Sequence, residues 1–340
     1  MGKKLNEMGF EIDVFTIREN KGDKKEENFD GINVRRIINS WHYKNSFWGA
    51  RNYWDIFRFT MALFKKRKEL RNFDLLVFNK WPILPPIVLP YFFKNKSVID
   101  WCEIRRSKLW YFIYKLMGNK FSRHTCVNDE IGKYLQSDLK IPEHKIKTIL
   151  SGIDSELFQK NESKKKDKSI LFFGRLSDHK DPEIVIKSFI AGKLCGKGYE
   201  LNVAGGGALL DILKTKYCDH KSVNIIGPVS DEKKIELLKA STLLVLPSQR
   251  EGFPRVIAEA AAAGTPTLTT WYPENGSVQV VEQYQVGWVC KPSIEELAKM
   301  IETYGTFGNE WREKSLTCIK AANNCFDWNV VCQEFVNFIE

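Results

Sequence analysis

Short apolar segments alternate with helical segments along this chain, and that order restricts the folds that it can adopt. Segments with the length and the apolar or β-branched content of strands lie at 11–17, 75–78, 97–100, 169–173, 200–204, 223–226, 243–246 and 267–270. Helices are predicted between several of them, for example at 184–189, 208–216 and 231–239. Strands that alternate with helices in this way are typical of parallel sheets covered on both faces. We therefore expect an α/β protein.

The length of 340 residues favours two domains rather than one hydrophobic core. The segment 160–168 (KNESKKKDK) is highly charged and lacks apolar residues, so it is the best candidate for a linker. We predict a first Rossmann-like domain at 1–159, a second at 160–322, and a terminal helix at 323–340 that packs back toward the first. Two doubly wound domains of this kind bind ligands at the carboxyl ends of their strands, in the cleft between them.

The start of the chain departs from this pattern. Residues 2–8 resemble the end of a helix closed by Gly9, and the strand at 11–17 follows directly. A doubly wound domain normally begins with a strand and a glycine-bearing turn before its first helix. The first domain is therefore expected to lack its first strand. A start codon assigned too late, a shortened chain and a true absence of the strand explain this equally well.

Several classes of protein are excluded by composition. The first 20 residues are rich in charge and hold no apolar run, which argues against a secretory signal. The longest apolar stretch, 75–93, is interrupted by Lys80 and four prolines and makes a poor membrane-spanning helix. Eight cysteines without a CxxC pair indicate buried free thiols in a reducing cytosol. With no acidic cluster either, we predict a cytoplasmic protein without metal or cofactor.

Two segments of the second half suggest binding of an anion. Gly174, Arg175 and Lys180 follow a buried strand, where both cations can reach one phosphate group. Gly205 and Gly206 lie between a strand and a helix, where glycine lets the backbone approach a ligand. Solvated surface cations and an ordinary turn are the simpler interpretations of these two segments.

The segment 251–259 (EGFPRVIAE) carries the strongest signal. Pro254 suits the first turn of a helix, so Glu251 should lie just before that helix and Glu259 about two turns inside it. The amides of 254–257 are expected to point toward an anion. A charge that complements the helix dipole is the simpler explanation for Glu251, and a buried ion pair is the simpler explanation for Glu259. The turn-rich segment 273–277 indicates only a loop.

With these motifs, residues 169–304 resemble the C-terminal domain of retaining, nucleotide-sugar-dependent glycosyltransferases of the family 4 group (glycosyl transferases group 1), which have the GT-B fold. The matching pieces are G-R-x-x-x-x-K at 174–180, A-G-G-G at 204–207, E-G-F-P-x-x-x-x-E at 251–259 and A-x-G-x-P at 262–266. Two shorter matches lie outside this range, at 151–158 (SGID with Phe158) and at 326–328 (Phe-Asp-Trp).

The resemblance implies a role for each matching residue. Arg175 and Lys180 would bind the donor diphosphate, Glu251 the sugar hydroxyls and Glu259 the ribose diol, which makes Glu251, Arg175 and Lys180 the catalytic candidates. The donor-binding set is Gly174, Arg175, Lys180, Gly205, Gly206, Glu251, Gly252, Phe253, Pro254, Arg255, Val256 and Glu259. Asp100 and Glu103 are weaker candidates for the acceptor side of the cleft. The resemblance implies transfer of a sugar to a glycan or lipid-linked acceptor without a metal.

The charge of the chain is concentrated in its first half. Residues 1–150 have a net charge of +12 and residues 151–340 one of −2. Residues 41–120 combine a net +11 with many aromatic residues, among them Trp48, Trp54 and Phe57, which suits the surface of an anionic membrane. Ordinary helices that pack their aromatic residues on a sheet are the simpler alternative. We predict no nucleic-acid partner, because the sequence contains no recognised nucleic-acid-binding module.

Two functions therefore remain in view. One is an active enzyme of glycan or polysaccharide biosynthesis, working in the cytoplasm or on the inner face of the membrane. The other is an inactive relative that binds a membrane, a glycan or a partner enzyme. A nucleotide-sugar epimerase of similar shape is a third possibility that fits the glutamate pair less well.

Overall fold

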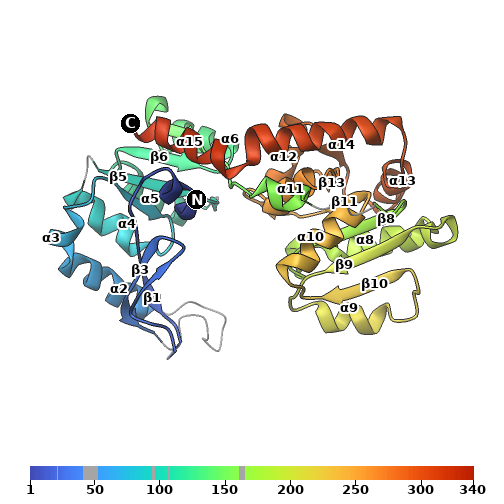
Figure 1. The fold of residues 1–340 in the computed structure, drawn as a ribbon, viewed down its shortest axis with the longest axis horizontal. Helices are drawn as coiled ribbons and strands as arrows, with labels where there is room; N and C mark the ends of the chain where they lie inside the picture. The colour runs from blue at the N-terminus through green and yellow to red at the C-terminus, as the bar shows by residue number, and fades with distance from the viewer. Residues whose placement is uncertain (21, 41–52, 94–95, 106, 161–164) are drawn as a thin grey trace. The chain divides into compact units, whose positions relative to one another are not determined.

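The computed structural model describes residues 1–340 except 21, 41–52, 94–95, 106 and 161–164. The chain divides into two compact units (Figure 1). Unit 1 consists of Met1–Ile149 and Cys332–Glu340, and unit 2 of Leu150–Val331. The predicted linker residues 161–164, the aromatic Trp48 and the basic Arg106 lie outside the described residues.

Unit 1 contains two sheets of its own. Its elements in chain order are α1 (Gly2–Glu7), β1 (Ile12–Arg18), β2 (Glu26–Phe29), β3 (Ile32–Asn39), α2 (Tyr53–Lys65), α3 (Arg67–Leu70), β4 (Leu76–Asn79), α4 (Leu84–Val88), the 3-10 helix η1 (Leu89–Phe92), β5 (Ser97–Trp101), α5 (Lys108–Gly118), β6 (Arg123–Cys126), α6 (Asp129–Ser137), the 3-10 helix η2 (Glu143–Lys145) and β7 (Ile146–Thr148). The strands form one sheet in the order β1-β3-β2 and a parallel sheet in the order β4-β5-β6-β7.

The smaller sheet of unit 1 contains an unpredicted hairpin. β2 and β3 pair antiparallel and are joined by Asp30 and Gly31, whose φ angles of +50° and +81° both lie in the left-handed region. Two such residues make the tight turn that matches the twist of a hairpin, and Asp-Gly is a favoured pair for it. β1 pairs in parallel with β3. Unit 1 is therefore not one continuous doubly wound sheet over its described residues.

Unit 2 begins with a short helix and then follows the strand–helix alternation closely. Its elements are α7 (Ser155–Gln159), β8 (Ser169–Phe173), the 3-10 helix η3 (Asp178–Lys180), α8 (Pro182–Ala191), the 3-10 helix η4 (Leu194–Lys197), β9 (Glu200–Ala204), α9 (Leu210–Lys216), β10 (Val223–Gly227), α10 (Asp231–Ala240), β11 (Leu243–Leu246), β12 (Arg250–Glu251), α11 (Arg255–Ala262), β13 (Thr267–Thr270), β14 (Glu274–Asn275), α12 (Gly276–Gln283), β15 (Gly287–Cys290), α13 (Ile294–Tyr304), α14 (Asn309–Ala321) and the π-helix η5 (Ala322–Phe326). The last helix, α15 (Trp328–Ile339), starts in unit 2 and ends in unit 1.

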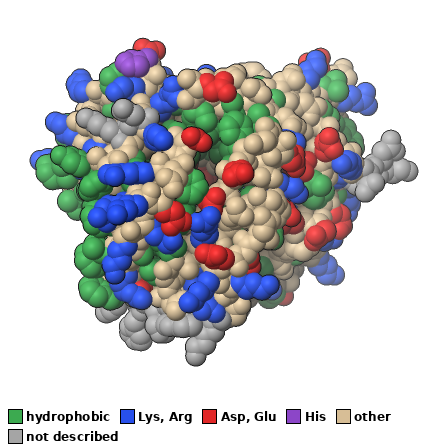
Figure 2. Space-filling view, turned by 60° about the vertical axis from the view of Figure 1, so that its left-hand side comes forward, with side chains coloured by type: hydrophobic (Ala, Val, Ile, Leu, Met, Phe, Trp, Pro, Cys, Tyr) green, Lys and Arg blue, Asp and Glu red, His purple; other side chains and the backbone are tan. Residues whose placement is uncertain are grey.

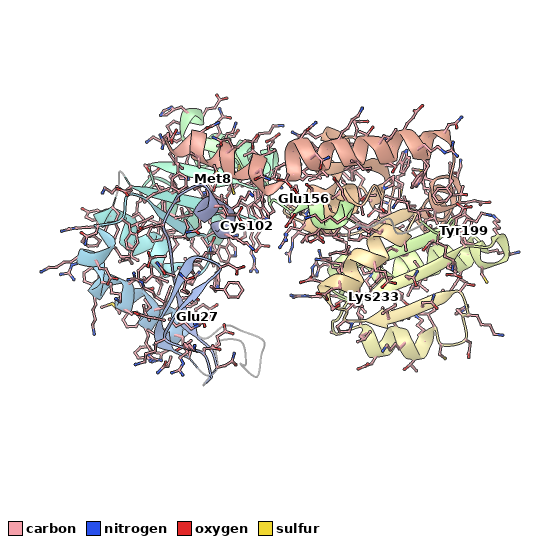
Figure 3. All side chains as sticks on the ribbon, in the orientation of Figure 1. Met8, Glu27, Cys102, Glu156, Tyr199 and Lys233 are labelled. Atoms are coloured by element: carbon pink, nitrogen blue, oxygen red, sulfur yellow. The ribbon has the colours of Figure 1, made fainter. Side chains whose placement is uncertain are left out.

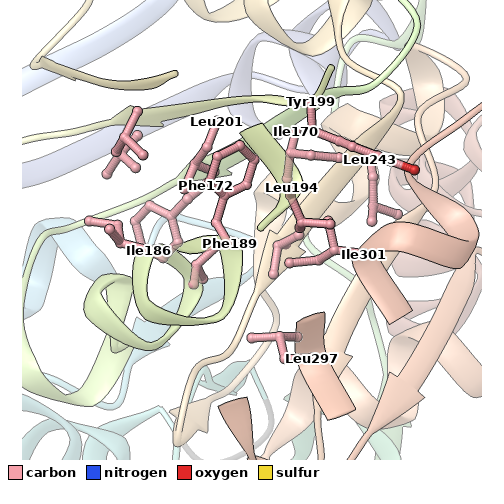
Figure 4. Packing of buried hydrophobic residues seen from close by; sticks show 14 of the residues in the cluster. Ile170, Phe172, Ile186, Phe189, Leu194, Tyr199, Leu201, Leu243, Leu297 and Ile301 are labelled. Carbon is pink, nitrogen blue, oxygen red and sulfur yellow. The ribbon is translucent and has the colours of Figure 1, made fainter. Parts of the chain in front are cut away.

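The main sheet of unit 2 is parallel, with the order β10-β9-β8-β11-β13-β15. Its central strands β8 and β11 are buried on both faces, which explains their nearly continuous apolar sequences, whereas the edge strands β10 and β15 are only partly buried. Figure 4 shows Ile170 and Phe172 of β8 packed with Ile186 and Phe189 of α8, and Leu297 and Ile301 of α13 belong to the same buried cluster. The eight predicted strands all form, with ends that differ by at most one residue.

Residues from the two ends of unit 2 bind each other. Ile153 forms a parallel bridge with Asp327, and its amide donates to the carbonyl of Phe326 at 2.8 Å. The Asp327 carboxylate accepts from the Ser155 hydroxyl at 2.6 Å and from the Asn329 amide at 2.9 Å. Burial raises the pKa of Asp327, but these hydrogen bonds together outweigh it and leave that pKa below its ordinary value. The motifs at 151–158 and 326–328 thus form one structural junction.

The prediction that the cysteines are buried is correct only in part. All eight are free; Cys126, Cys290, Cys318 and Cys332 are buried, whereas Cys102, Cys195 and Cys218 are exposed. The exposed ones lie outside the sheets: Cys102 follows β5 (Figure 3), Cys195 lies in η4 and Cys218 follows α9.

Candidate functional site

The strand order of unit 2 places its predicted site residues at one point of the sheet. β8 and β11 are neighbours, and the connections that leave them run toward opposite edges of the sheet. Open α/β sheets bind ligands at such a switch point, beyond the carboxyl ends of the two strands. The loop 174–180 follows β8 and the segment 247–251 follows β11, so both end at this point.

Lys180 and Glu251 meet there. The Lys180 ammonium is hydrogen-bonded to Glu251 Oε1, and the two side chains are only 18% and 12% exposed. Burial, together with the positive charge of nearby Arg175, lowers the pKa of Lys180 to about 8. Arg175 itself is exposed. The loop therefore presents two cations, one fixed by a carboxylate and one open to solvent.

Glu251 is held from a second side by its own loop. Its Oε1 accepts a hydrogen bond from Ser248 Oγ at 3.0 Å. Its backbone lies in β12, which pairs with β14 so that Glu251 stands opposite Asn275. The buried Asn275 side chain in turn caps α12 by accepting from the Ser277 amide. The turn-rich segment 273–277 is therefore part of the support of Glu251 rather than an isolated loop.

Glu259 forms a buried ion pair, which was the simpler of the two interpretations of this residue in the sequence. Its side chain is 7% exposed on α11, and Oε1 lies 3.0 Å from Lys234 Nζ of α10 and 3.8 Å from Arg255 Nη2. An apolar helix tolerates this charge because α10 packs against α11 and supplies a cation. Figure 3 labels the neighbouring residue, Lys233, on α10.

The prediction of four amides at the start of this helix is wrong. Pro254 has no N–H, and the amide of Ile257 donates to the Pro254 carbonyl at 2.9 Å. α11 starts at Arg255, so the amides of Arg255 and Val256 remain for an anion. Gly252 and Phe253 connect Glu251 to this helix start, and the Phe253 ring lies 6.0 Å from that of Phe326.

Gly205 and its neighbours have a structural role. The φ angles of Gly205 and Gly207 are +136° and +154°, and a Cβ at either position would overlap a backbone carbonyl of the loop after β8. The Gly174 amide donates to Ala204 and the Leu176 amide to Gly206. The glycines after β9 therefore let that loop pack directly against the loop that carries Arg175.

The two predicted acceptor-side residues lie in unit 1. Asp100 accepts from Thr125 Oγ1 at 2.8 Å and from Cys102 Sγ at 3.1 Å. Glu103 is exposed, and its carboxylate lies 3.9 Å from the Nζ of Lys80, which also donates to the Glu103 carbonyl. Burial lowers the pKa of Lys80, which stands directly after β4.

Sequence analysis missed three polar residues of these sites. Lys234 pairs with Glu259, Ser248 holds Glu251 and Lys80 contacts Glu103. Of these three, only Lys80 could have been found from the sequence. It directly follows a buried strand, and such a position lies at the ligand-binding edge of a parallel sheet. Lys234 is one of several charged residues on its helix, and nothing in the sequence separates it from them.

A cavity of unit 1 is lined by none of the predicted site residues. It has a volume of about 740 Å³ and is lined by α5 and α6 residues, including Lys108, Tyr111 and Lys133. Over the described residues, no group of three His, Cys, Asp or Glu side chains is placed to hold a metal ion.

Solved structures with similar architecture identify the fold. The chain superposes on sucrose-phosphate synthase from Thermosynechococcus elongatus with a TM-score of 0.75, 17% identity and coverage of 99% of this chain and 90% of that one. It superposes on HepE of Anabaena, solved in complex with UDP, with a TM-score of 0.70, 18% identity and coverage of 91% and 86%. The fold is that of the GT-B glycosyltransferases.

Sequence relatives point to the same group of proteins. The chain is 26% identical to an uncharacterized glycosyltransferase of Methanocaldococcus jannaschii over 97% of its own length and 89% of the relative's. It is 27% identical to an uncharacterized glycosyltransferase of Haemophilus influenzae, with 73% and 71% covered. Residues 154–322, which hold every predicted donor-site residue, match the family described as glycosyl transferases group 1. That segment, just under half of the chain, therefore belongs to the glycosyl transferases group 1 family, and the two relatives that cover most of the chain are described as glycosyltransferases as well.

Proposed function

We propose that this glycosyltransferase is a retaining enzyme that transfers a hexosyl group from a nucleotide-sugar donor to a glycan or lipid-linked acceptor without a metal. The observation that carries the proposal is the meeting of Lys180 and Glu251 at the switch point of unit 2, with Arg175 on the same loop. A cation and a carboxylate in contact provide matched partners for a diphosphate and for sugar hydroxyls. The structure of HepE with UDP supports a nucleotide as ligand of this fold.

The binding step exchanges contacts that already exist. The donor diphosphate would take the Lys180 ammonium from Glu251 and also reach Arg175 and the amides of Arg255 and Val256. Glu251, still held by Ser248, would then accept from the sugar hydroxyls. Glu259 would accept from the ribose diol beside its ion pair with Lys234.

The chemical step breaks the bond between the anomeric carbon and the diphosphate oxygen. The acceptor oxygen forms its bond to that carbon from the same face of the sugar, and its proton passes to the departing phosphate. Negative charge grows on the diphosphate in this step, and Lys180, Arg175 and the helix amides are positioned to stabilise it. The fixed cations of the chain thus supply the charge that a metal supplies in other transferases.

The first test is binding of UDP, GDP, ADP and their sugar forms, measured by thermal shift. A ligand at a hundred times its dissociation constant adds about 2.7 kcal/mol of apparent stability. We expect one nucleotide to raise the Tm of the wild type and to lose this effect in Arg175→Ala and Glu259→Ala. Arg312→Ala and Glu236→Ala are matched controls, because they remove the same charges from exposed sites of α14 and α10.

No shift with any nucleotide, from a folded wild type, would contradict the donor site. Turnover of the nucleotide sugar that binds, measured in the presence of EDTA, tests whether the reaction needs a metal. Loss of turnover in EDTA would overturn the proposal of a metal-independent reaction. The anomeric configuration of the product, measured by NMR, distinguishes retention from inversion.

A further inference from the structure

We propose that the outer face of α2, α4, η1 and α5 in unit 1 binds the surface of a membrane that contains anionic lipids. The inference gives the proposed lipid-linked acceptor a location. It rests on a different part of the molecule from the donor site and is tested without donor or acceptor. Among the described residues, no helix is both long enough and apolar enough to cross a membrane, so the contact proposed here is peripheral.

These helices form one layer. α4 and η1 connect β4 to β5 and α5 connects β5 to β6, and each pair of strands is parallel and adjacent. Connections of this kind are right-handed, so both helices cover the same face of the sheet. α2 packs against α4, the Phe64 and Phe92 rings lie 5.4 Å apart, and Lys120 at the end of α5 donates to the Ile87 carbonyl. The three segments are therefore contiguous.

The side of this layer that faces away from the sheet is unusually apolar. On α5, Leu109, Phe112 and Leu116 are 67%, 60% and 43% exposed, and their spacing of three and four residues puts them on one stripe. The opposite side of α5 carries the buried Tyr114 and Met117. The exposed apolar side chains of the other segments are Tyr53, Trp54, Phe57 and Met61 on α2, Val88 on α4, and Tyr91 and Phe92 on η1.

Positive charge lies beside these side chains. Arg58 and Lys65 on α2, Lys68 on α3, and Lys108 and Lys115 on α5 are all exposed. Within the described helices α2, α4, η1 and α5 the sole acidic residue is Asp55, which is buried and bound to Ser40 and Arg58. Figure 2 shows hydrophobic and basic side chains next to one another on the surface brought forward from the left of Figure 1. The four helices are thus apolar and cationic without an exposed carboxylate in their described residues, and the neighbouring Glu69 of α3 is paired with Arg35 and Lys66.

This combination favours a bilayer over a protein partner. Protein interfaces are depleted in lysine, whereas the membrane interface accommodates aromatic rings at the headgroup level and attracts lysine and arginine to anionic lipid. A helix with an apolar stripe between basic side chains suits burial in the headgroup region. The exposed large apolar side chains on the described part of unit 2 are spread over different elements and loops: Leu157 on α7, Ile212 on α9, Trp271 after β13, Phe307 before α14 and Leu316 on α14.

The test is co-sedimentation of the full chain with vesicles of phosphatidylcholine, with and without 30 mol% phosphatidylglycerol, in low and high salt. We expect binding to the anionic vesicles, at least tenfold weaker binding to the neutral ones, and weakening in high salt. The double variant Leu109→Glu with Phe112→Glu should lose binding by at least tenfold. Leu316→Glu is the matched control, since Leu316 is 61% exposed on α14 of unit 2, and it should bind like the wild type.

The substituted side chains are already exposed, so the variants should keep the thermal transition of the wild type. Absence of binding by the wild type to anionic vesicles would overturn the proposal, as would an equal loss in Leu316→Glu. Self-association through this face without vesicle binding, measured by analytical ultracentrifugation, would also overturn it. Nucleotide binding by the double variant should be unchanged, which separates this proposal from the donor site.

Discussion

At the scale of single residues, Lys180 should make binding at the proposed donor site depend on pH. Its pKa of about 8 means that its ammonium loses a proton within the range in which the protein can be studied. Above that pH a neutral amine no longer attracts a diphosphate, so affinity for the effective nucleoside diphosphate should fall by up to tenfold per pH unit. Titration calorimetry between pH 6.5 and 9.5 measures this. Lys180→Arg stays charged and should bind evenly over the range; an equal decline in that variant would assign the effect elsewhere.

Lys234 is expected to stabilise unit 2 through Glu259. Lys234→Met would leave a carboxylate that is 7% exposed with Arg255 at 3.8 Å as its remaining cation. Removing one partner of a buried charged pair should cost about 1–3 kcal/mol of unfolding free energy. Lys233→Met is the control, because Lys233 is 45% exposed and pairs with exposed Glu236, so it should cost less than about 0.5 kcal/mol. Urea unfolding that gives equal losses for both would contradict this role.

The structure brings predicted residues into contact where their places in the sequence follow the order of the strands. Lys180 was predicted in the loop after one buried strand and Glu251 between a second buried strand and a helix, and the parallel sheet brings the ends of these two strands together. Lys234 was missed because its contact with Glu259 depends on how two helices pack, which no local pattern encodes. The prediction that the backbone at Pro254 donates to an anion was wrong because proline has no backbone N–H.

At the scale of elements, the two loops after β8 and β9 depend on glycine. Gly205→Ala would combine a φ of +136° with an overlap between the new Cβ and the Gly174 carbonyl. We expect a loss of more than about 2 kcal/mol, measured as a lower Tm, with weaker nucleotide binding. Gly196→Ala is the control, because a Cβ there meets no atom within 4 Å. A similar Tm for the two variants would show that the loops adapt.

The strands of the two units differ in how well they could be predicted. β8 and β11 were predicted with their observed ends, because strands buried on both faces carry nearly continuous apolar sequence. β9 and β13 contain polar residues and were also predicted with their observed ends. β6 (Arg-His-Thr-Cys) and β15 (Gly-Trp-Val-Cys) lack such a run and were missed. The hairpin of β2 and β3 was missed although Asp30-Gly31 is a turn signal, since the flanking residues are mostly polar.

At the scale of the whole molecule, the small sheet of unit 1 should be locally less stable than the main sheet of unit 2. No residue of β1 is buried, whereas all of β11 and β13 are. Amides in elements with little burial exchange through low-energy openings. Hydrogen exchange followed by mass spectrometry should therefore show faster exchange in β1 and β3 than in β11 and β13. β5, which is mostly buried in unit 1, serves as the control and should exchange slowly. Equal protection of β1 and β11 would contradict this.

The bridge between Ile153 and Asp327 has a consequence for the order in which the chain is made. Because it ties the entry and exit of unit 2 together, unit 2 is complete once residue 331 has left the ribosome. Unit 1 starts first but finishes last, since it includes Cys332–Glu340, whose Cys332 thiol donates to the Met1 carbonyl and whose Phe338 ring lies under Arg123. A nascent chain stalled after residue 331 should therefore hold a finished unit 2 attached to an unfinished unit 1. The half of the protein that carries the positive charge and the exposed aromatic face is the half that must wait for residues 332–340.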